Sequence, residues 1–145
     1  MAERAKSEEE LRRLSMEMRY LEQTAEALQQ RISMVNAALT DISYANMTLD
    51  GIEKEKENAE LFVPIGGSSY VKVKLADSNK VIIGLGSGVS IEKTLLEARV
   101  TLKERLDELE KTMNSAQQQF SQVAERINSG RSRLETLLGA REGKP

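Results

Sequence analysis

The chain has 145 residues and contains no cysteine, no histidine and no tryptophan. Without cysteine it can have neither a disulfide framework nor a thiolate ligand. A metal site would therefore have to consist of carboxylates, yet no Asp-rich loop of the calcium-binding kind is present. These absences predict a protein that uses no metal or other cofactor and has no catalytic residues.

Aromatic residues make up only 3% of the sequence, whereas charged residues make up 30%. A compact globule of this length normally fills its core with bulkier side chains. A narrow seam between two helices can be filled by leucine, isoleucine, valine, methionine and alanine instead. The composition therefore favours paired helices over a sphere.

No strong excess of either charge is present, because 21 basic and 23 acidic residues give a net charge of −2. This balance gives no electrostatic reason to expect nucleic-acid binding. No apolar run is long enough to span a bilayer, and the segment 1–10 has no signal-peptide core. We expect a cytoplasmic protein that binds neither nucleic acid nor membrane.

Proline and glycine, which interrupt helices, are confined to few places. The prolines are Pro64 and Pro145, no glycine precedes Gly51, and most of the others lie between 66 and 88. We predict an N-terminal helix over 8–58, two β-hairpins over 60–90, a C-terminal helix over 91–138 and a tail over 139–145. Ser90 is the predicted N-cap of the second helix, and Gly139 its stop.

Both predicted helices carry an apolar repeat with alternating steps of three and four residues, typical of a coiled coil. The first repeat comprises Leu11, Leu14, Met18, Leu21, Ala25, Leu28, Ile32, Val35, Leu39, Ile42, Asn46 and Leu49. The second comprises Leu102, Leu106, Leu109, Met113, Ala116, Phe120, Val123, Ile127, Gly130, Leu134 and Leu137. Their similar lengths predict an antiparallel pair with Leu11 near Leu134 and Leu49 near Leu95.

Between the helices the apolar residues alternate with a period of two, which indicates strands. The inward positions are Leu61, Val63, Ile65, Val71, Val73, Leu75, Val81, Ile83, Leu85 and Val89. Glycine and serine at 66–68 and at 86–88 predict the two hairpin turns. Isolated hairpins are marginal in water and have open edges, so these ten residues are predicted to mediate oligomerisation.

The central segment resembles the α class of the prefoldin family. The resemblance rests on Leu61–Gly66, on Tyr70–Leu75 and on Val81–Lys93, where a Gly-x-Gly element precedes a Glu-Lys helix start. Two hairpins between the helices are typical of the α class, whereas the β class has one. The flanking heptad repeats extend the resemblance to nearly the whole chain.

This resemblance implies a mostly α, α+β fold in which two hairpins contribute to an oligomeric β-barrel platform. It implies a hexamer of two α-class and four β-class subunits. Such hexamers hold unfolded or nascent polypeptides at their coiled-coil tips and pass them to a group II chaperonin without ATP. Relatives of this type also include filament-forming proteins.

Unfolded clients are expected to contact the ends of the helix pair. The candidate residues are Leu11, Leu14, Met16, Met18, Leu134, Leu137 and Leu138. Five of them lie in the seam, while Met16 and Leu138 fall outside it. Methionine and leucine suit a site that accepts many sequences, because their flexible side chains repack around different partners.

Three other interpretations of the sequence are a dinucleotide-binding site, a phosphate loop and a structural coiled coil. The segment Val81–Gly88 approaches a dinucleotide fingerprint, but Val89 stands where the last glycine should be. A phosphate loop is disfavoured because Glu92 precedes Lys93 where glycine is required. The main alternative is a structural coiled-coil spacer or filament-forming protein that binds no client.

Overall fold

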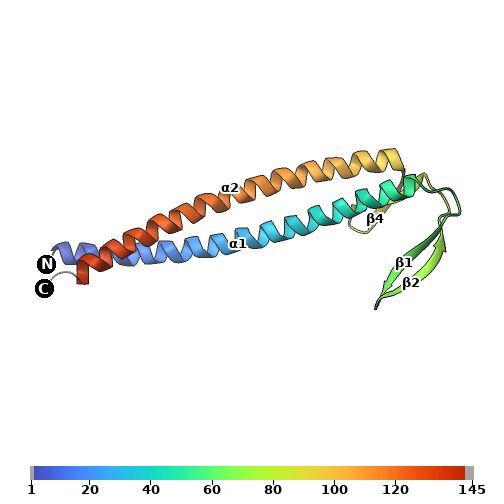
Figure 1. Cartoon of the computed structure of the whole chain (residues 1–145). Coiled ribbons are helices and arrows are strands. Elements are labelled where there is room, and N and C mark those ends of the chain that lie inside the picture. Colours follow the sequence, from blue (N-terminus) through green and yellow to red (C-terminus); the bar gives the residue numbers. More distant parts are fainter. Residues whose placement is uncertain (1, 143–145) are drawn as a thin grey trace. The chain divides into compact units, whose positions relative to one another are not determined.

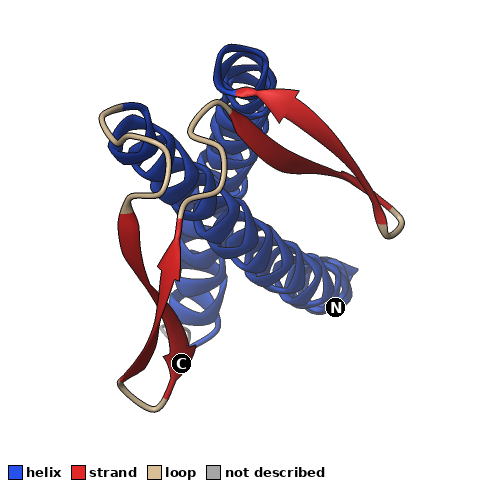
Figure 2. Cartoon of the chain, turned by 90° about the vertical axis from the view of Figure 1, so that its right-hand side faces the viewer, coloured by secondary structure: helices blue, strands red, loops and turns tan. Residues whose placement is uncertain are grey.

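The computed structural model describes residues 2–142 and consists of two helices with two β-hairpins between them along the chain (Figure 1). The elements in chain order are α1 (Ala2–Glu53), β1 (Glu60–Gly66), β2 (Ser69–Lys74), β3 (Lys80–Gly86), β4 (Val89–Thr94) and α2 (Leu95–Glu142). β1 pairs with β2 and β3 with β4, both antiparallel, as separate two-stranded sheets (Figure 2). The predicted fold class is confirmed.

Contacts divide the chain into two compact units. One combines the chain up to Ala37 with the chain from Glu110 onward and is called here the two-helix unit. The other comprises Ala38–Leu109 and is called the hairpin unit, since it holds both hairpins and the adjoining turns of α1 and α2.

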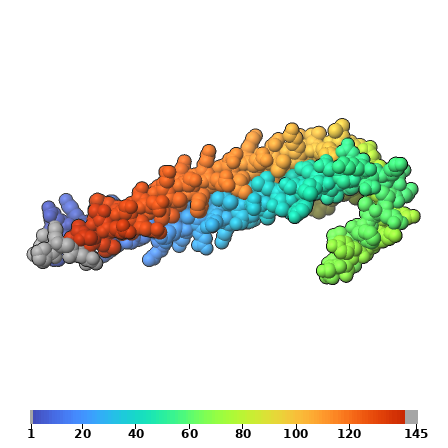
Figure 3. Space-filling model, viewed as in Figure 1, coloured from blue at the N-terminus to red at the C-terminus, as the bar shows by residue number. Residues whose placement is uncertain are grey.

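In the two-helix unit, the start of α1 (blue) lies along the end of α2 (red) in Figures 1 and 3. Their seam includes buried Met18, Leu21, Leu28, Val35 and Ala116, all at predicted heptad positions. Glu10 pairs with Arg133 and Glu17 with Arg126, so the helices are antiparallel. The pairing of Glu10 and Arg133 also agrees with the predicted proximity of Leu11 and Leu134.

The core of the hairpin unit is a cluster of buried residues from both helices and one strand. The cluster comprises Leu49, Ile83, Leu95, Ala98 and Leu102, with Ile42, Ala45, Ile52 and Val81 packed against it. Leu49 and Leu95 therefore share one cluster, as the antiparallel pairing predicted. Burial of apolar surface, at roughly 25 cal/mol per Å², is the main term that holds this unit together.

The two hairpins use the same turn geometry. In the first, Gly67 and Ser68 have φ values of 55° and 58°, and in the second, Ser87 and Gly88 have 52° and 77°. Positive φ at both central residues defines the type I′ turn, whose twist matches that of paired strands. In each hairpin the register shifts by one residue just before the turn, which is typical of a β-bulge.

Several predicted boundaries were wrong. The first helix ends at Glu53 rather than at 58, because Asn58 has a φ of 65° and donates its N–H to the carbonyl of Leu75, 2.7 Å away. Its backbone thus belongs to the first hairpin. Both helices extend farther than predicted at their other ends. α1 begins at Ala2 rather than at 8, and α2 continues through Gly139, its predicted stop, to Glu142.

Ser90 is not the N-cap of the second helix, because β4 extends to Thr94 and includes both Ser90 and Ile91. Thr94 caps α2: its Oγ1 accepts a hydrogen bond from the Glu97 N–H at 3.2 Å and donates one to Glu97 Oε1 at 2.9 Å. The Leu95 N–H is bonded to the carbonyl of Asn79. This threonine–glutamate spacing is a capping box, a signal present in the sequence.

Candidate functional site: hairpin faces and helix tip

The first hairpin presents an aliphatic face without cover. Its register places Leu61 opposite Val73 and Val63 opposite Val71, so these four side chains share one face. Val63 is 44% exposed, and Val71 is also exposed, whereas Leu61 and Val73 are half-buried. An isolated two-stranded hairpin is at best marginally stable in water, so this face is a candidate assembly surface.

The opposite face of the first hairpin mixes apolar and charged side chains. There Phe62 stands opposite Lys72 and Pro64 opposite Tyr70, and both aromatic rings are exposed. Lys72 pairs with Glu60 at 3.1 Å, an exposed ion pair that contributes little to stability. A hairpin with apolar residues on both faces is typical of a strand pair covered on both sides.

The second hairpin is fixed to the helices of its unit. Ile83 is only 8% exposed and belongs to the core cluster, and Val81 packs against it. Arg105 Nη2 donates a hydrogen bond to the carbonyl of Gly84 at 2.6 Å, and Lys93 Nζ donates one to Thr101 Oγ1 at 3.0 Å. Leu85 and Val89, closer to the turn, are exposed, and so is Ile91, which lies directly opposite Ile83.

Of the ten predicted assembly residues, nine lie on the four strands and Leu75 follows β2 directly. The Leu75 N–H donates to the carbonyl of Ala59, which extends the first ladder. Sequence reasoning did not single out the exposed side chains of Phe62, Tyr70 and Ile82. The signal for them was available, because each is a bulky residue at the alternate position of a strand.

The second candidate site is the tip of the two-helix unit, defined as residues 11–18 of α1 and 134–138 of α2. Met16 is 68% exposed and Leu138 is 44% exposed, while Leu11, Leu14, Leu134 and Leu137 are half-buried in the seam. The seam residues Leu21 and Leu28, farther from the ends, are buried. The tip therefore combines half-buried seam residues with two exposed apolar side chains, and half-buried residues such as Phe120 and Ile127 also occur along the rest of the seam.

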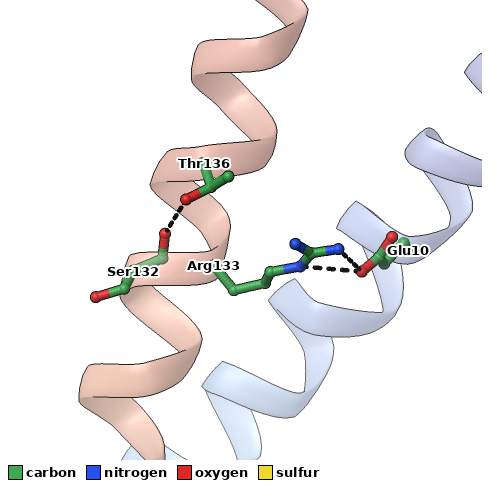
Figure 4. Close-up of polar contacts among 4 residues, drawn as sticks. All are labelled: Glu10, Ser132, Arg133 and Thr136. Carbon is green, nitrogen blue, oxygen red and sulfur yellow. Dashed lines mark hydrogen bonds and ion pairs between the residues drawn. The ribbon is translucent and has the colours of Figure 1, made fainter.

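Met18 differs from the other predicted tip residues, because it is 6% exposed. Its thioether lies against the backbone of Gly130, where a Cβ would overlap Met18 Sδ. The tip is also crossed by an ion pair (Figure 4), in which Arg133 Nη2 lies 2.9 Å from Glu10 Oε1. The predicted residues are therefore brought together, but Met18 could contact a client only after leaving its place in the seam.

Arg99 links the end of α1 to the start of α2 in the hairpin unit. Its two terminal nitrogens lie 2.7 Å from Asp50 Oδ1 and 2.7 Å from Glu53 Oε2. The hydrogen bond to Asp50 and the charges of Asp50 and Glu53 raise the pKa of Arg99, against the opposing effect of desolvation. The guanidinium therefore stays charged at any physiological pH. Sequence reasoning did not assign this residue a role.

Comparison with known proteins gives consistent matches. The family model described as "Prefoldin subunit" matches residues 21–139. The chain is 30% identical over 135 residues to "Prefoldin subunit alpha" of Methanococcoides burtonii, covering 93% of this chain and 95% of that one. It is 33% identical over 135 residues to "Prefoldin subunit alpha" of Methanosarcina mazei, covering 91% and 92%.

The chain belongs to the prefoldin family. The resemblance to the α class, drawn from the hairpin segment, is confirmed by these archaeal relatives. Prefoldin subunits are chaperone subunits that assemble with other prefoldin subunits.

Solved structures show the same fold. A filamentous prefoldin from Methanocaldococcus jannaschii matches with a TM-score of 0.67 at 20% identity, covering 79% of this chain and 95% of that chain. The prefoldin beta subunit from Thermococcus strain KS-1 matches with a TM-score of 0.59 at 17% identity, covering 88% and 90%.

Residues 2–142 contain no group of three or more acidic, histidine or cysteine side chains placed to hold a metal ion. Over the same residues, neither helix has a segment apolar enough to cross a membrane. The features that stand out are thus contact surfaces.

Proposed function

We propose that this prefoldin subunit is part of an ATP-independent holdase that binds unfolded or nascent polypeptides at its helix tip. The protein acts in the cytoplasm, is not an enzyme and uses no cofactor. Residues 1–145 are proposed to belong to one such subunit. Clients are held by apolar contact, and no bond is made or broken.

The observation that carries this proposal is the exposure of apolar side chains at the tip. Met16 and Leu138 lie outside the seam, and the seam residues beside them are only half-buried. Two helices alone cannot cover every apolar group at such an end, and helix ends fray. An unfolded chain exposes apolar side chains in an irregular order, which flexible methionine and leucine can accommodate.

Assembly is proposed to occur through the hairpins. The first hairpin has one aliphatic face and exposed Phe62 and Tyr70 on the other, and the second hairpin exposes Leu85 and Val89 near its turn. These surfaces support a platform shared with β-class subunits, with two copies of this chain and four of the partner. A client that touches several tips of one hexamer is retained although each contact is weak. Once one tip is bound, the other tips meet the client at a high effective concentration.

Release is proposed to occur by transfer to a group II chaperonin that competes for the client or the tips. Reversible apolar contacts suit such a transfer, since their affinity is limited and no nucleotide is needed to break them.

The test of the tip replaces Met16 and Leu138 with glutamine, singly and together, in the assembled protein. The matched control is Met34→Gln, because Met34 is an equally accessible methionine of the same unit outside the tip. Suppression of aggregation of a chemically denatured protein should fall for the tip variants and not for the control. Unchanged suppression in the double variant would refute the tip assignment.

Mass measurement distinguishes the proposed holdase from the alternative, a spacer or filament without client binding. Native mass spectrometry of the chain with a β-class subunit should show one hexamer containing two copies of this chain. A simple dimer or an open polymer, together with no client binding, would favour the alternative.

A further inference from the structure

One section of α2 in the two-helix unit carries no charge. Residues 112–124 contain no Asp, Glu, Lys or Arg, although charged residues make up 30% of the whole chain. Charged side chains resume on both sides, with Glu110 and Lys111 before and Glu125 and Arg126 after. A helix surface in water normally carries many charges, which form pairs one turn apart and limit association.

Five polar residues of this section lie on one face of the helix, while Ser115 and Gln119 lie outside it. Asn114, Gln117, Gln118, Ser121 and Gln122 are exposed and follow the spacing of i, i+3, i+4, i+7 and i+8. Together they line a shallow surface hollow and are called here the amide face. The amide face points away from the seam. On α2 the seam is formed by the heptad positions Met113, Ala116 and Phe120.

Within the described residues, no hydrogen bond or ion pair involves the side chains of the amide face. The cross-helix ion pairs of this unit lie nearer the tip, at Arg126 and Arg133. The face is therefore free to bind an external group.

We propose that the amide face is a second contact surface for the unfolded client, and this rests on the holdase function proposed above. A side-chain amide offers both donors and an acceptor, so it can bond the N–H or the C=O of any peptide unit. An unfolded polypeptide presents such groups along its length, whatever its sequence. The lack of charge lets the face accept acidic and basic clients alike, because neither is repelled.

The test adds charge to the face without changing its shape or helix propensity. In the assembled protein, Gln118→Glu with Gln122→Glu gives the face two carboxylates, and glutamate forms helices about as well as glutamine. The control is Lys103→Gln with Lys111→Gln, which makes the same change of net charge on a charged section of the same helix.

The probes are two synthetic unfolded polypeptides of equal apolar content, one with excess lysine and one with excess aspartate. Fluorescence anisotropy gives the Kd of each. The unchanged protein should bind both with similar Kd. In the glutamate variant, the Kd of the acidic probe should rise about three- to tenfold, and the Kd of the basic probe should stay the same or fall. The control should change the ratio of the two Kd values by less than twofold.

A photo-crosslinking residue at position 118 gives an independent readout. A covalent adduct with either probe supports the proposal. Adducts formed at position 16 but not at 118, or equal effects of the two charge variants on the Kd ratio, would overturn this inference while leaving the holdase function intact. A crosslink between two copies of this chain without probe would identify self-association instead and also overturn it. If neither probe binds the unchanged protein, the proposed function itself fails.

Discussion

Gly130 is the position where a single added methyl group should have the most informative effect. It lies inside α2, where glycine normally destabilises a helix. In this seam, however, the absent Cβ makes room for the side chain of Met18. An alanine Cβ would overlap Met18 Sδ and would lie 3.5 Å from its Cγ and 3.7 Å from its Cε. The overlap involves the middle of the side chain, so Met18 must rotate away as a whole.

The magnitude follows from two opposing terms. Replacing glycine with alanine in a helix interior gains about 1 kcal/mol of helix propensity. Moving a buried methionine into water loses about 1.5–3 kcal/mol. We therefore expect Gly130→Ala to lower the free energy of unfolding by about 0.5–2 kcal/mol, the difference between these terms.

The assay is urea unfolding followed by far-ultraviolet circular dichroism, at one fixed protein concentration because assembly shifts apparent stability. The matched control is Gly139→Ala. Gly139 lies in the same helix with nothing within 4 Å of its added Cβ, so this variant should be neutral or stabilising.

A double variant identifies the contact responsible. With Met18→Ala present, Gly130→Ala should become neutral or stabilising, and the coupling of the two changes should be at most the methionine term, about 1.5–3 kcal/mol. If Gly130→Ala alone stabilises the protein as much as Gly139→Ala does, Met18 is not held against Gly130 and the reasoning is refuted.

Three further substitutions, two of them with a matched control, test the hairpin unit by the same unfolding assay. Ile83→Ala removes a core side chain and should cost about 2–4 kcal/mol, whereas Ile82→Ala, on the exposed face, should cost under about 0.5 kcal/mol when the chain is unassembled; equal costs would contradict the assigned core. Thr94→Ala removes the cap of α2 and should cost about 1 kcal/mol, and an unchanged midpoint would show that the capping box contributes nothing. Gly86→Ala forces a side chain onto a φ of 96° and should cost about 1–2 kcal/mol; Gly84→Ala, at a site with open space and no positive φ, should cost less, and the reverse order would rule out turn strain as the cause.

The local elements were largely predictable because their signals are short-range. The heptad repeat from Leu11 to Leu49 marks the α1 seam, since a helix brings residues three and four apart to one face. The glycines and serines near 66–68 and 86–88 mark the turns, since positive φ favours such residues. The end of α1 and the start of α2 were misplaced, because the backbone of Asn58 bonds to Leu75 and that of Ser90 pairs with Gly84, so both belong to the hairpins rather than to the helices.

The sequence by itself determined where the chain is helical, where it alternates as strands, and which residues have the pattern of contact surfaces. From the sequence, Val63 and Ile83 have the same predicted role, because they occupy equivalent positions of two similar hairpins. Only the tertiary structure decided that Ile83 is buried against Leu49 and Leu95 while Val63 stays exposed, and that Met18 rests on Gly130. The physical reason is that periodicity reports which side of an element is apolar, whereas the surface that covers this side comes from residues far away along the chain.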